Sequence, residues 1–292
     1  MTDEEYAYLA KTILKMIDID LDHYRAKQMR RRLETFIESE QNIKVVDYCR
    51  KLETNPDLTQ KMRDFLTINV SEFFRDGSHF DNLRNIVLPD LLKKNARLNI
   101  WSAGCSNGSE IYSVAMLLDE LTPTIRHRLI ATDIDHTILD NARAGGPYSE
   151  RELKSISKQQ MEKYFTQTAN GFCVVENIKQ RVIFKKHDLL CDSYDRGFDL
   201  IMCRNVVIYF TDEAKLKLNK GFYESLKEGG VMFVGGSEII MGAKDIGFAN
   251  MLPCFYRKTP SNIIESSQAS QSYNRNLGLP SSIIPPSRDM RT

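Results

Sequence analysis

The stretch Leu98-Asn-Ile-Trp-Ser-Ala-Gly-Cys-Ser-Asn-Gly-Ser-Glu-Ile-Tyr-Ser113 determines the expected fold. Its first six residues, 98–103, are typical of a buried strand, and a helix is expected to begin near Ser109. Between them lies a tight turn that carries Gly104 and Gly108. A strand, a glycine turn and a helix in this order open a doubly wound α/β sheet, in which ligands bind at the carboxyl ends of the strands. Because glycine has no Cβ, this turn allows a ligand to approach the backbone closely.

Three well-known kinds of turn fit the residues less well. A phosphate-binding loop needs Lys followed by Ser or Thr after its last glycine, where this chain has Ser109-Glu110. A dinucleotide fingerprint needs three glycines and no carboxylate beside the pyrophosphate, whereas this turn has two glycines and Glu110. Residues 104–108 do match the G-x-S-x-G turn of hydrolases, with Ser106 as the nucleophile. That alternative needs a later His, but the last one, His187, lies mid-chain, and no HGGG-like segment precedes the turn.

S-adenosylmethionine suits the residues better, because it has a cationic sulfonium, an ammonium and a ribose diol but no phosphate. Glu110 can face the cationic end. Asp133 closes the next apolar run, 128–133, and is expected at the end of the neighbouring strand, where a ribose diol would be held. Asp133 could instead cap a helix that starts near Asp135, or serve both purposes.

Composition indicates a globular protein without a metal site. The chain has 292 residues, of which 42% are hydrophobic, and its formal net charge of +1 excludes an overall basic or acidic character. The six cysteines form no C-x-x-C pair and the five histidines no H-E-x-x-H motif, so we expect reduced thiols and no metal. Cys105 is a minor candidate nucleophile. Without an apolar run of membrane-spanning length or a signal peptide, we expect a cytoplasmic protein.

Residues 1–75 are expected to form helices. Thr2 and Glu5 fit a capping box ahead of the first helix, and Asp22 can cap a second. Further helices are expected from Val45 to Leu52 and from Pro56 to about Ile68.

One side of the second helix is basic and carries Arg25, Lys27, Arg30, Arg31 and Arg32. Such a face is usually only solvated. It would also attract an acidic partner, either nucleic acid or an acidic protein surface. Aromatic residues do not alternate with these arginines, which disfavours a site for single-stranded nucleic acid.

Between the helical region and the strand at 98–103 lies Phe65-Leu-Thr-Ile-Asn-Val-Ser-Glu-Phe-Phe-Arg-Asp76. Its polar residues interrupt apolar ones, and alone it could be a linker in which Arg75 pairs with Glu72. Ser78 is then expected to cap a helix that Pro89 kinks or ends.

After Asp133 the pattern predicts a helix over 137–144, an inserted antiparallel subdomain over about 148–180 with a hairpin turn at Asn170-Gly171, and a return to the sheet. Strands are expected at 181–188, 198–205 and 230–235, a helix at 211–227, and an edge strand at 254–258. Asp188, Arg204 and Asn205 would then lie at the same sheet rim as Gly104 and Asp133. Residues 259–292 have the composition of a disordered tail.

Four blocks of this chain resemble the signatures of the CheR family, the chemotaxis receptor methyltransferases of bacteria. They are the block at 65–76 above, Ile100-Trp-Ser-Ala-Gly-Cys-Ser-Asn-Gly-Ser-Glu-Ile-Tyr-Ser113, Ala131-Thr-Asp-Ile-Asp135 and Cys203-Arg-Asn-Val-Val-Ile-Tyr-Phe210. The resemblance runs from about residue 1 to 258. It implies a helical domain (1–75) that docks on receptors, and a Rossmann-like methyltransferase domain (76–258) with the small β subdomain inserted in it. The implied activity is transfer of the methyl group of S-adenosylmethionine to glutamate side chains on cytoplasmic receptor helices.

The resemblance also implies roles for individual residues. Contacts to S-adenosylmethionine are expected from Asn69, Ser71, Arg75, Gly104, Glu110, Asp133, Asp188, Leu189, Arg204 and Asn205. Arg75 and Tyr209 would lie near the transferred methyl group, and Arg25, Arg31 and Arg32 would belong to the docking surface. The family turn usually continues Gly-Glu-Glu-Pro-Tyr-Ser, so Ser109 and Ile111 depart from it.

We expect a monomer that binds chemoreceptors, needs no metal, and neither enters membranes nor binds nucleic acid. Two alternatives remain open: a methyltransferase for nucleic acid or a small molecule, and a non-enzymatic regulator that binds S-adenosylmethionine. The sequence does not indicate whether the β subdomain grips a receptor's C-terminal peptide.

Overall fold

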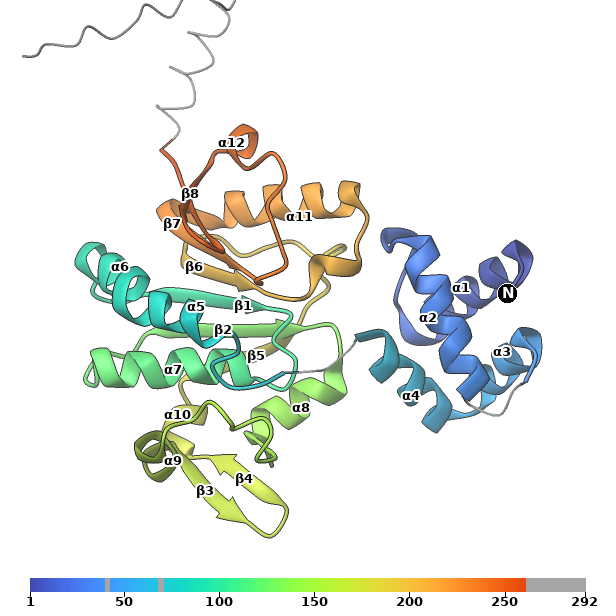
Figure 1. Ribbon diagram of the computed structural model, residues 1–292, viewed down its shortest axis with the longest axis horizontal. Coiled ribbons are helices and arrows are strands. Elements are labelled where there is room, and N and C mark those ends of the chain that lie inside the picture. Colours follow the sequence, from blue (N-terminus) through green and yellow to red (C-terminus); the bar gives the residue numbers. More distant parts are fainter. Residues whose placement is uncertain (40–42, 68–70, 261–292) are drawn as a thin grey trace, which may run out of the picture.

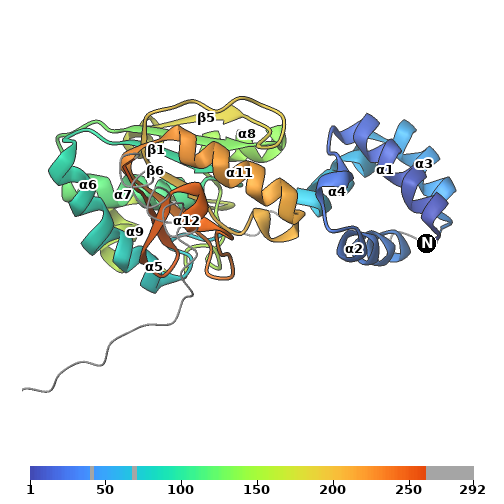
Figure 2. The same cartoon turned by 90° about the horizontal axis from the view of Figure 1, so that it is seen from above.

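The computed structural model describes residues 1–39, 43–67 and 71–260. Helices near the N-terminus lie to one side of a larger α/β domain in both views (Figures 1 and 2). The expected tail, apart from Thr259 and Pro260, and the expected cofactor contact Asn69 lie outside the described residues. No helix within these ranges is both long and apolar enough to cross a membrane.

The N-terminal domain contains α1 (Asp3–Ile17), the short 3-10 helix η1 (Leu21–His23), α2 (Ala26–Ser39), α3 (Val45–Thr54) and α4 (Pro56–Thr67). Its core joins the apolar sides of these helices, with Leu9, Ile13, Leu33 and Met62 fully buried. The capping box of Thr2 and Glu5 is confirmed. The prediction that Asp22 caps the second helix is wrong, because Asp22 lies inside η1 and α2 begins only at Ala26.

A seven-stranded sheet in the order β5-β2-β1-β6-β7-β9-β8 forms the centre of the α/β domain. Its strands are β1 (Asn99–Ala103), β2 (Arg128–Asp133), β5 (Val182–Lys186), β6 (Phe198–Cys203), β7 (Leu226–Val234), β8 (Phe248–Leu252) and β9 (Phe255–Lys258). The strands from β5 to β7 are parallel, and β9 runs antiparallel to both neighbours. The strand order reverses between β1 and β6, and such a switch point is where doubly wound sheets bind ligands.

The predicted edge strand at 254–258 is not at the edge. It corresponds to β9, which lies between β7 and β8, so β8 is the outermost strand. Cys254, with φ of +69°, lies in the tight connection that turns β8 back into β9. The sequence-based assignment missed β8 because only Phe248 of its five residues is buried and Asn250 interrupts the apolar run.

Helices cover both faces of the sheet. One face packs against α5 (Gly77–Asn82), α6 (Leu88–Lys94), α7 (Ser109–Leu121) and α8 (His136–Ala144), and the other against α11 (Asp212–Ser225). The predicted Ser78 cap is wrong, since α5 begins at Gly77 and its N-cap is Asp76. The chain also stays helical through Pro89, which lies in the first turn of α6 after the π-helical turn η2 (Leu83–Val87), where a missing N–H is tolerated.

The insertion is confirmed as a small antiparallel element. It contains α9 (Lys158–Tyr164), the hairpin of β3 (Phe165–Thr168) and β4 (Gly171–Val174), and α10 (Glu176–Lys179). The two strands pair only with each other in their sheet, and the hairpin projects from the α/β domain (Figure 1). Asn170 and Gly171 form its turn, as predicted.

Candidate functional site

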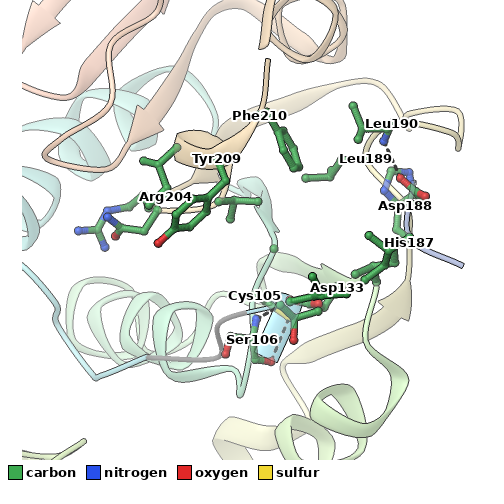
Figure 3. A pocket seen from close by; sticks show the side chains of 18 of the residues that line it. Cys105, Ser106, Asp133, His187, Asp188, Leu189, Leu190, Arg204, Tyr209 and Phe210 are labelled. Carbon is green, nitrogen blue, oxygen red and sulfur yellow. Dashed lines mark hydrogen bonds between the residues drawn. The ribbon is translucent and has the colours of Figure 1, made fainter. Parts of the chain in front are cut away.

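A cavity of about 230 Å³ lies at the switch point, where the helical domain meets the sheet rim. Figure 3 shows Cys105, Ser106 and Asp133 on one side of it, with Arg204, Tyr209 and Phe210 on another. The lining includes all the described residues that were expected to contact the cofactor, namely Ser71, Arg75, Gly104, Glu110, Asp133, Asp188, Leu189, Arg204 and Asn205. Among the lining residues that sequence reasoning did not select are Ile19, Asp20, His23 and Tyr24, all from the helical domain.

The glycine turn is closed onto the end of β2. The backbone N–H groups of Gly104 and Cys105 both donate to the carbonyl of Thr132, at 2.8 and 2.9 Å. Gly104 has φ of +77°, and a Cβ there would lie 2.5 Å from a methyl carbon of Val206. The missing side chain therefore makes room for Val206 of the neighbouring strand's loop, in addition to leaving the backbone open to a ligand.

Asp133 is the carboxylate that the turn brings into the site. Its Oδ2 accepts the N–H of Ser106 at 2.8 Å, and its Oδ1 accepts the N–H of Asp135 at 3.1 Å. Burial raises the pKa of Asp133 to about 6, because desolvation outweighs these hydrogen bonds. The alternative that Asp133 caps the next helix is wrong, since Asp135 caps α8 through the N–H groups of Thr137 and Ile138.

Arg204 lies between two carboxylates. Its side chain is 2% exposed, and the guanidinium donates to Glu110 Oε2 at 3.3 Å and to Asp76 Oδ2 at 2.8 Å. It also donates to the carbonyl of Arg75 at 3.0 Å and packs over the ring of Phe233. One cation between two carboxylates leaves a negative excess, to which Asp133 adds when it is ionised. This part of the site therefore favours a cationic ligand.

The segment 71–76 is held against α7 by buried aromatic residues. The N–H of Phe74 donates to Ser113 Oγ at 3.0 Å, and the N–H of Phe73 donates to the carbonyl of Glu152 at 3.0 Å. Glu72, which could have paired with Arg75, forms an ion pair with Lys154 at 2.6 Å. This packing places Ser71 and Arg75 at the cavity wall.

Glu238 is a site residue that sequence reasoning missed. Its carboxylate accepts the N–H groups of Gly235, Asn205 and Val207, at 2.7, 2.9 and 3.2 Å. Burial raises its pKa. It thereby fixes the loop after β6, in which Asn205 adopts φ of +60°. A carboxylate two residues beyond the glycine pair that follows β7 was the available signal.

The helical domain closes the cavity beside Tyr209. The carbonyl of Tyr209 accepts the N–H of Arg25 at 2.9 Å, and the carbonyl of His23 accepts the N–H of Thr211 at 2.9 Å. Tyr24 packs edge-on against Phe210, with ring centroids 4.9 Å apart. The two domains therefore share one site.

The three expected docking arginines lie in different surroundings. Arg31 is exposed, and Arg25 forms an ion pair with Asp212 at 3.1 Å. Arg32 is half-buried: it donates to the carbonyl of Phe65 at 2.8 Å, and its guanidinium lies over the ring of Tyr209 at 4.9 Å. Burial lowers the pKa of Arg32. The helix pattern predicted a solvated position for all three arginines. Of the three, Arg31 alone is exposed without an ion pair or ring contact among the described residues.

At the far end of the cavity, Asp188 shapes its own turn. Its Oδ1 accepts the N–H of Leu190 at 2.7 Å, while its N–H donates to Asp192 at 2.8 Å. Leu189, Leu190 and Ile134 supply an apolar wall here. An apolar wall next to a carboxylate suits a flat heterocycle with polar edges.

The hydrolase alternative finds no support in this geometry. Ser106 Oγ is buried and has no hydrogen-bond partner among the described residues, so no His activates it there. Burial raises the pKa of the Cys105 thiol well above its usual value, which keeps it protonated. Within the described ranges no three His, Cys, Asp or Glu side chains gather to hold a metal ion.

Comparison with known proteins agrees with this site. Residues 4–67 match the all-alpha domain of CheR methyltransferases, and residues 69–251 match the CheR methyltransferase SAM binding domain. A chemotaxis protein methyltransferase of Listeria monocytogenes is 37% identical over 258 residues, which cover 88% of this chain and 98% of the relative. Chemotaxis protein methyltransferases of Listeria innocua (36%, covering 88% and 98%) and Borreliella burgdorferi (32%, covering 88% and 95%) are also similar. The chain therefore belongs to the CheR methyltransferase family and is an S-adenosylmethionine-dependent methyltransferase.

Proposed function

We propose that this enzyme methylates glutamate side chains on the cytoplasmic helices of chemoreceptors and produces glutamyl methyl esters. The observation that carries the proposal is the acidic cavity shared by the sheet rim and the helical domain. The helix α2, which contacts Tyr209 through Arg32, also carries the exposed Arg31. An acidic cavity attracts a cationic methyl donor, and an exposed arginine on α2 attracts an acidic substrate. We place the protein in the cytoplasm as a monomer, in accordance with this substrate.

The residues of the cavity fit S-adenosylmethionine. Glu110, held by Ser102 Oγ at 2.8 Å, would take the cationic amino acid end, and Asp133 the ribose diol. Asp188 and Leu189 would hold the adenine, and Ser71, Gly104, Arg204 and Asn205 would complete the pocket. A contact from Asn69, which lies outside the described residues, is proposed on the resemblance alone. When bound, S-adenosylmethionine supplies a methyl group on a positively charged sulfur.

The chain needs no general base for this reaction, because a glutamate side chain with a pKa of about 4.3 is already ionised at neutral pH. Its task is to align the reacting atoms and to exclude water. Arg75 and Tyr209 would orient the incoming carboxylate. Arg32 on the Tyr209 ring, and the packing of Tyr24 against Phe210, would keep Tyr209 in place and cover the site.

Arg31 supports the receptor-docking part of the proposal. Methylatable receptor helices are rich in glutamate, and an exposed arginine on α2 would attract them. Arg31→Glu should raise KM for receptor severalfold and leave the Kd for S-adenosylhomocysteine unchanged. Arg32→Glu should also lower kcat, because Arg32 contacts Tyr209. Unchanged receptor kinetics in both variants would contradict the docking role.

Methyl transfer to receptor-containing membranes tests the proposal. The enzyme is incubated with S-adenosylmethionine labelled on its methyl group, and the products are then treated with mild base. Carboxyl methyl esters release labelled methanol, whereas N-methylated nucleic acid or small molecules do not. Label on nucleic acid alone would favour the rival substrate class, and no transfer despite binding would favour a non-enzymatic regulator.

A further inference from the structure

Two large apolar side chains stand exposed on the loop that follows β7. Ile239 is 77% exposed and Met241 is 59% exposed, the two highest values for large hydrophobic residues in the part of the chain that the structure describes. Ile240, between them, is only 4% exposed and packs into the core on the α11 side of the sheet. The loop thus presents alternate side chains to solvent, and the exposed pair lies on a segment that is anchored.

This loop is bonded to a segment that lines the cofactor cavity. Glu238, directly before Ile239, binds the N–H groups of Asn205 and Val207, and both Asn205 and Val206 line the cavity. The 3-10 helix η3 (Val207–Tyr209) is therefore contacted at both ends. Glu238 of this loop binds its first residue, Val207, and Arg32 of α2 packs on its last residue, Tyr209. The short helix η3 thus connects the cationic helix α2 to the segment that carries the two exposed apolar side chains.

We propose that Ile239 and Met241 form an apolar docking surface for the receptor helix that presents the glutamate to be methylated. This inference rests on the proposed function and extends it to the way the substrate is held. Three N–H groups hold Glu238, and Ile240 is buried, so the loop is already fixed before binding and little ordering entropy is lost.

A helix is the partner that fits this arrangement. With side chains, a helix is about 10–12 Å wide, and residues three or four apart share a face. A helix whose glutamate enters beside Tyr209 would lie along η3, with neighbouring side chains facing α2 at one end and the loop after β7 at the other. Its acidic residues would meet α2 and its apolar residues would meet Ile239 and Met241. The cations attract the helix over a distance, and the apolar contact keeps it bound.

The test compares Ile239→Ser/Met241→Ser with wild type and with Ile183→Ser, a matched control. Ile183 is 49% exposed, but it lies on β5 at the opposite edge of the sheet. Receptor methylation is measured at low and high salt, together with calorimetric binding of S-adenosylhomocysteine and co-sedimentation with receptor-containing vesicles. The double variant should raise KM for receptor about tenfold and weaken co-sedimentation to a similar extent.

The other measurements identify the cause. Cofactor affinity and kcat should stay at wild-type values, and the rise in KM should persist at high salt, where the effect of Arg31→Glu fades. Three results would overturn this inference and leave the proposed function standing. They are a KM of the double variant equal to that of an active wild type, an equal rise in KM in Ile183→Ser, and an equal loss of binding to vesicles without receptor. Failure of wild type to methylate receptors would refute both.

Discussion

Burial of Asp133 couples both the stability of the protein and its affinity for the cofactor to pH. The Asp133 pKa of about 6, against an ordinary 3.8, means that the folded protein binds this proton more tightly than the unfolded chain. The stability contributed by the proton is complete below the ordinary pKa and is lost as pH rises through about 6. At about 1.36 kcal/mol per pKa unit the full loss is about 3 kcal/mol, of which roughly 1.3 kcal/mol falls between about pH 5 and pH 7.

Asp133→Asn isolates this effect, because asparagine does not titrate. Urea unfolding without cofactor should show the free energy of unfolding of wild type falling, relative to the variant, by about 1.3 kcal/mol from pH 5 to pH 7. Calorimetry should show wild-type affinity for S-adenosylhomocysteine dropping about tenfold per pH unit below about pH 6, with no such dependence in the variant. A difference in unfolding free energy that is constant across this range would refute the reasoning.

Three further substitutions test other parts of the site. Gly104→Ala should lower the free energy of unfolding by about 2–4 kcal/mol, because φ is positive there and the new Cβ would collide with Val206. Denaturant titration should show a smaller loss when the same change is made in a Val206→Ala background. An equal loss in both backgrounds would contradict the collision. Arg204→Met should lower the free energy of unfolding in urea titrations by about 3 kcal/mol, because Glu110 and Asp76 lose their shared cation. A loss below about 1 kcal/mol would contradict this, since it would mean that water solvates the two carboxylates instead. Tyr209→Phe should lower kcat several-fold without changing the calorimetric Kd for S-adenosylhomocysteine; equal turnover would remove Tyr209 from the mechanism.

Local patterns predicted the central part of the fold. The apolar run at 98–103, the glycine turn and the helix from Ser109 correspond to β1, the turn and α7, because each is determined by neighbouring residues. The same reasoning placed Asp133, Asp188 and Arg204 at one rim, since parallel strands share their carboxyl ends. Cap residues were less predictable. Asp20, Asp22, Asp133 and Asp135 all have capping chemistry, and only the backbone conformation decides which of them caps.

Contacts between distant segments could not be read from the sequence. Arg32 fitted a solvated helical face by periodicity, yet it packs on Tyr209, a residue of the other domain. Tyr24 and Glu238 shape the cavity through partners far away in the chain, at Phe210 and Asn205. Tyr24 has no local motif, and the glycine pair before Glu238 does not indicate which N–H groups that carboxylate binds, so the packed structure was needed to place both residues.

The central claim is that carboxylates at this rim bind S-adenosylmethionine through its cationic end. Equilibrium binding of the methyl donor to Glu110→Gln tests it most directly, with Glu53→Gln on the exposed side of α3 as the matched control. The account predicts that the Glu110 variant binds roughly tenfold to a hundredfold more weakly, while the control binds as wild type does. No detectable binding to wild type, or equal affinity in the Glu110 variant, would contradict the account.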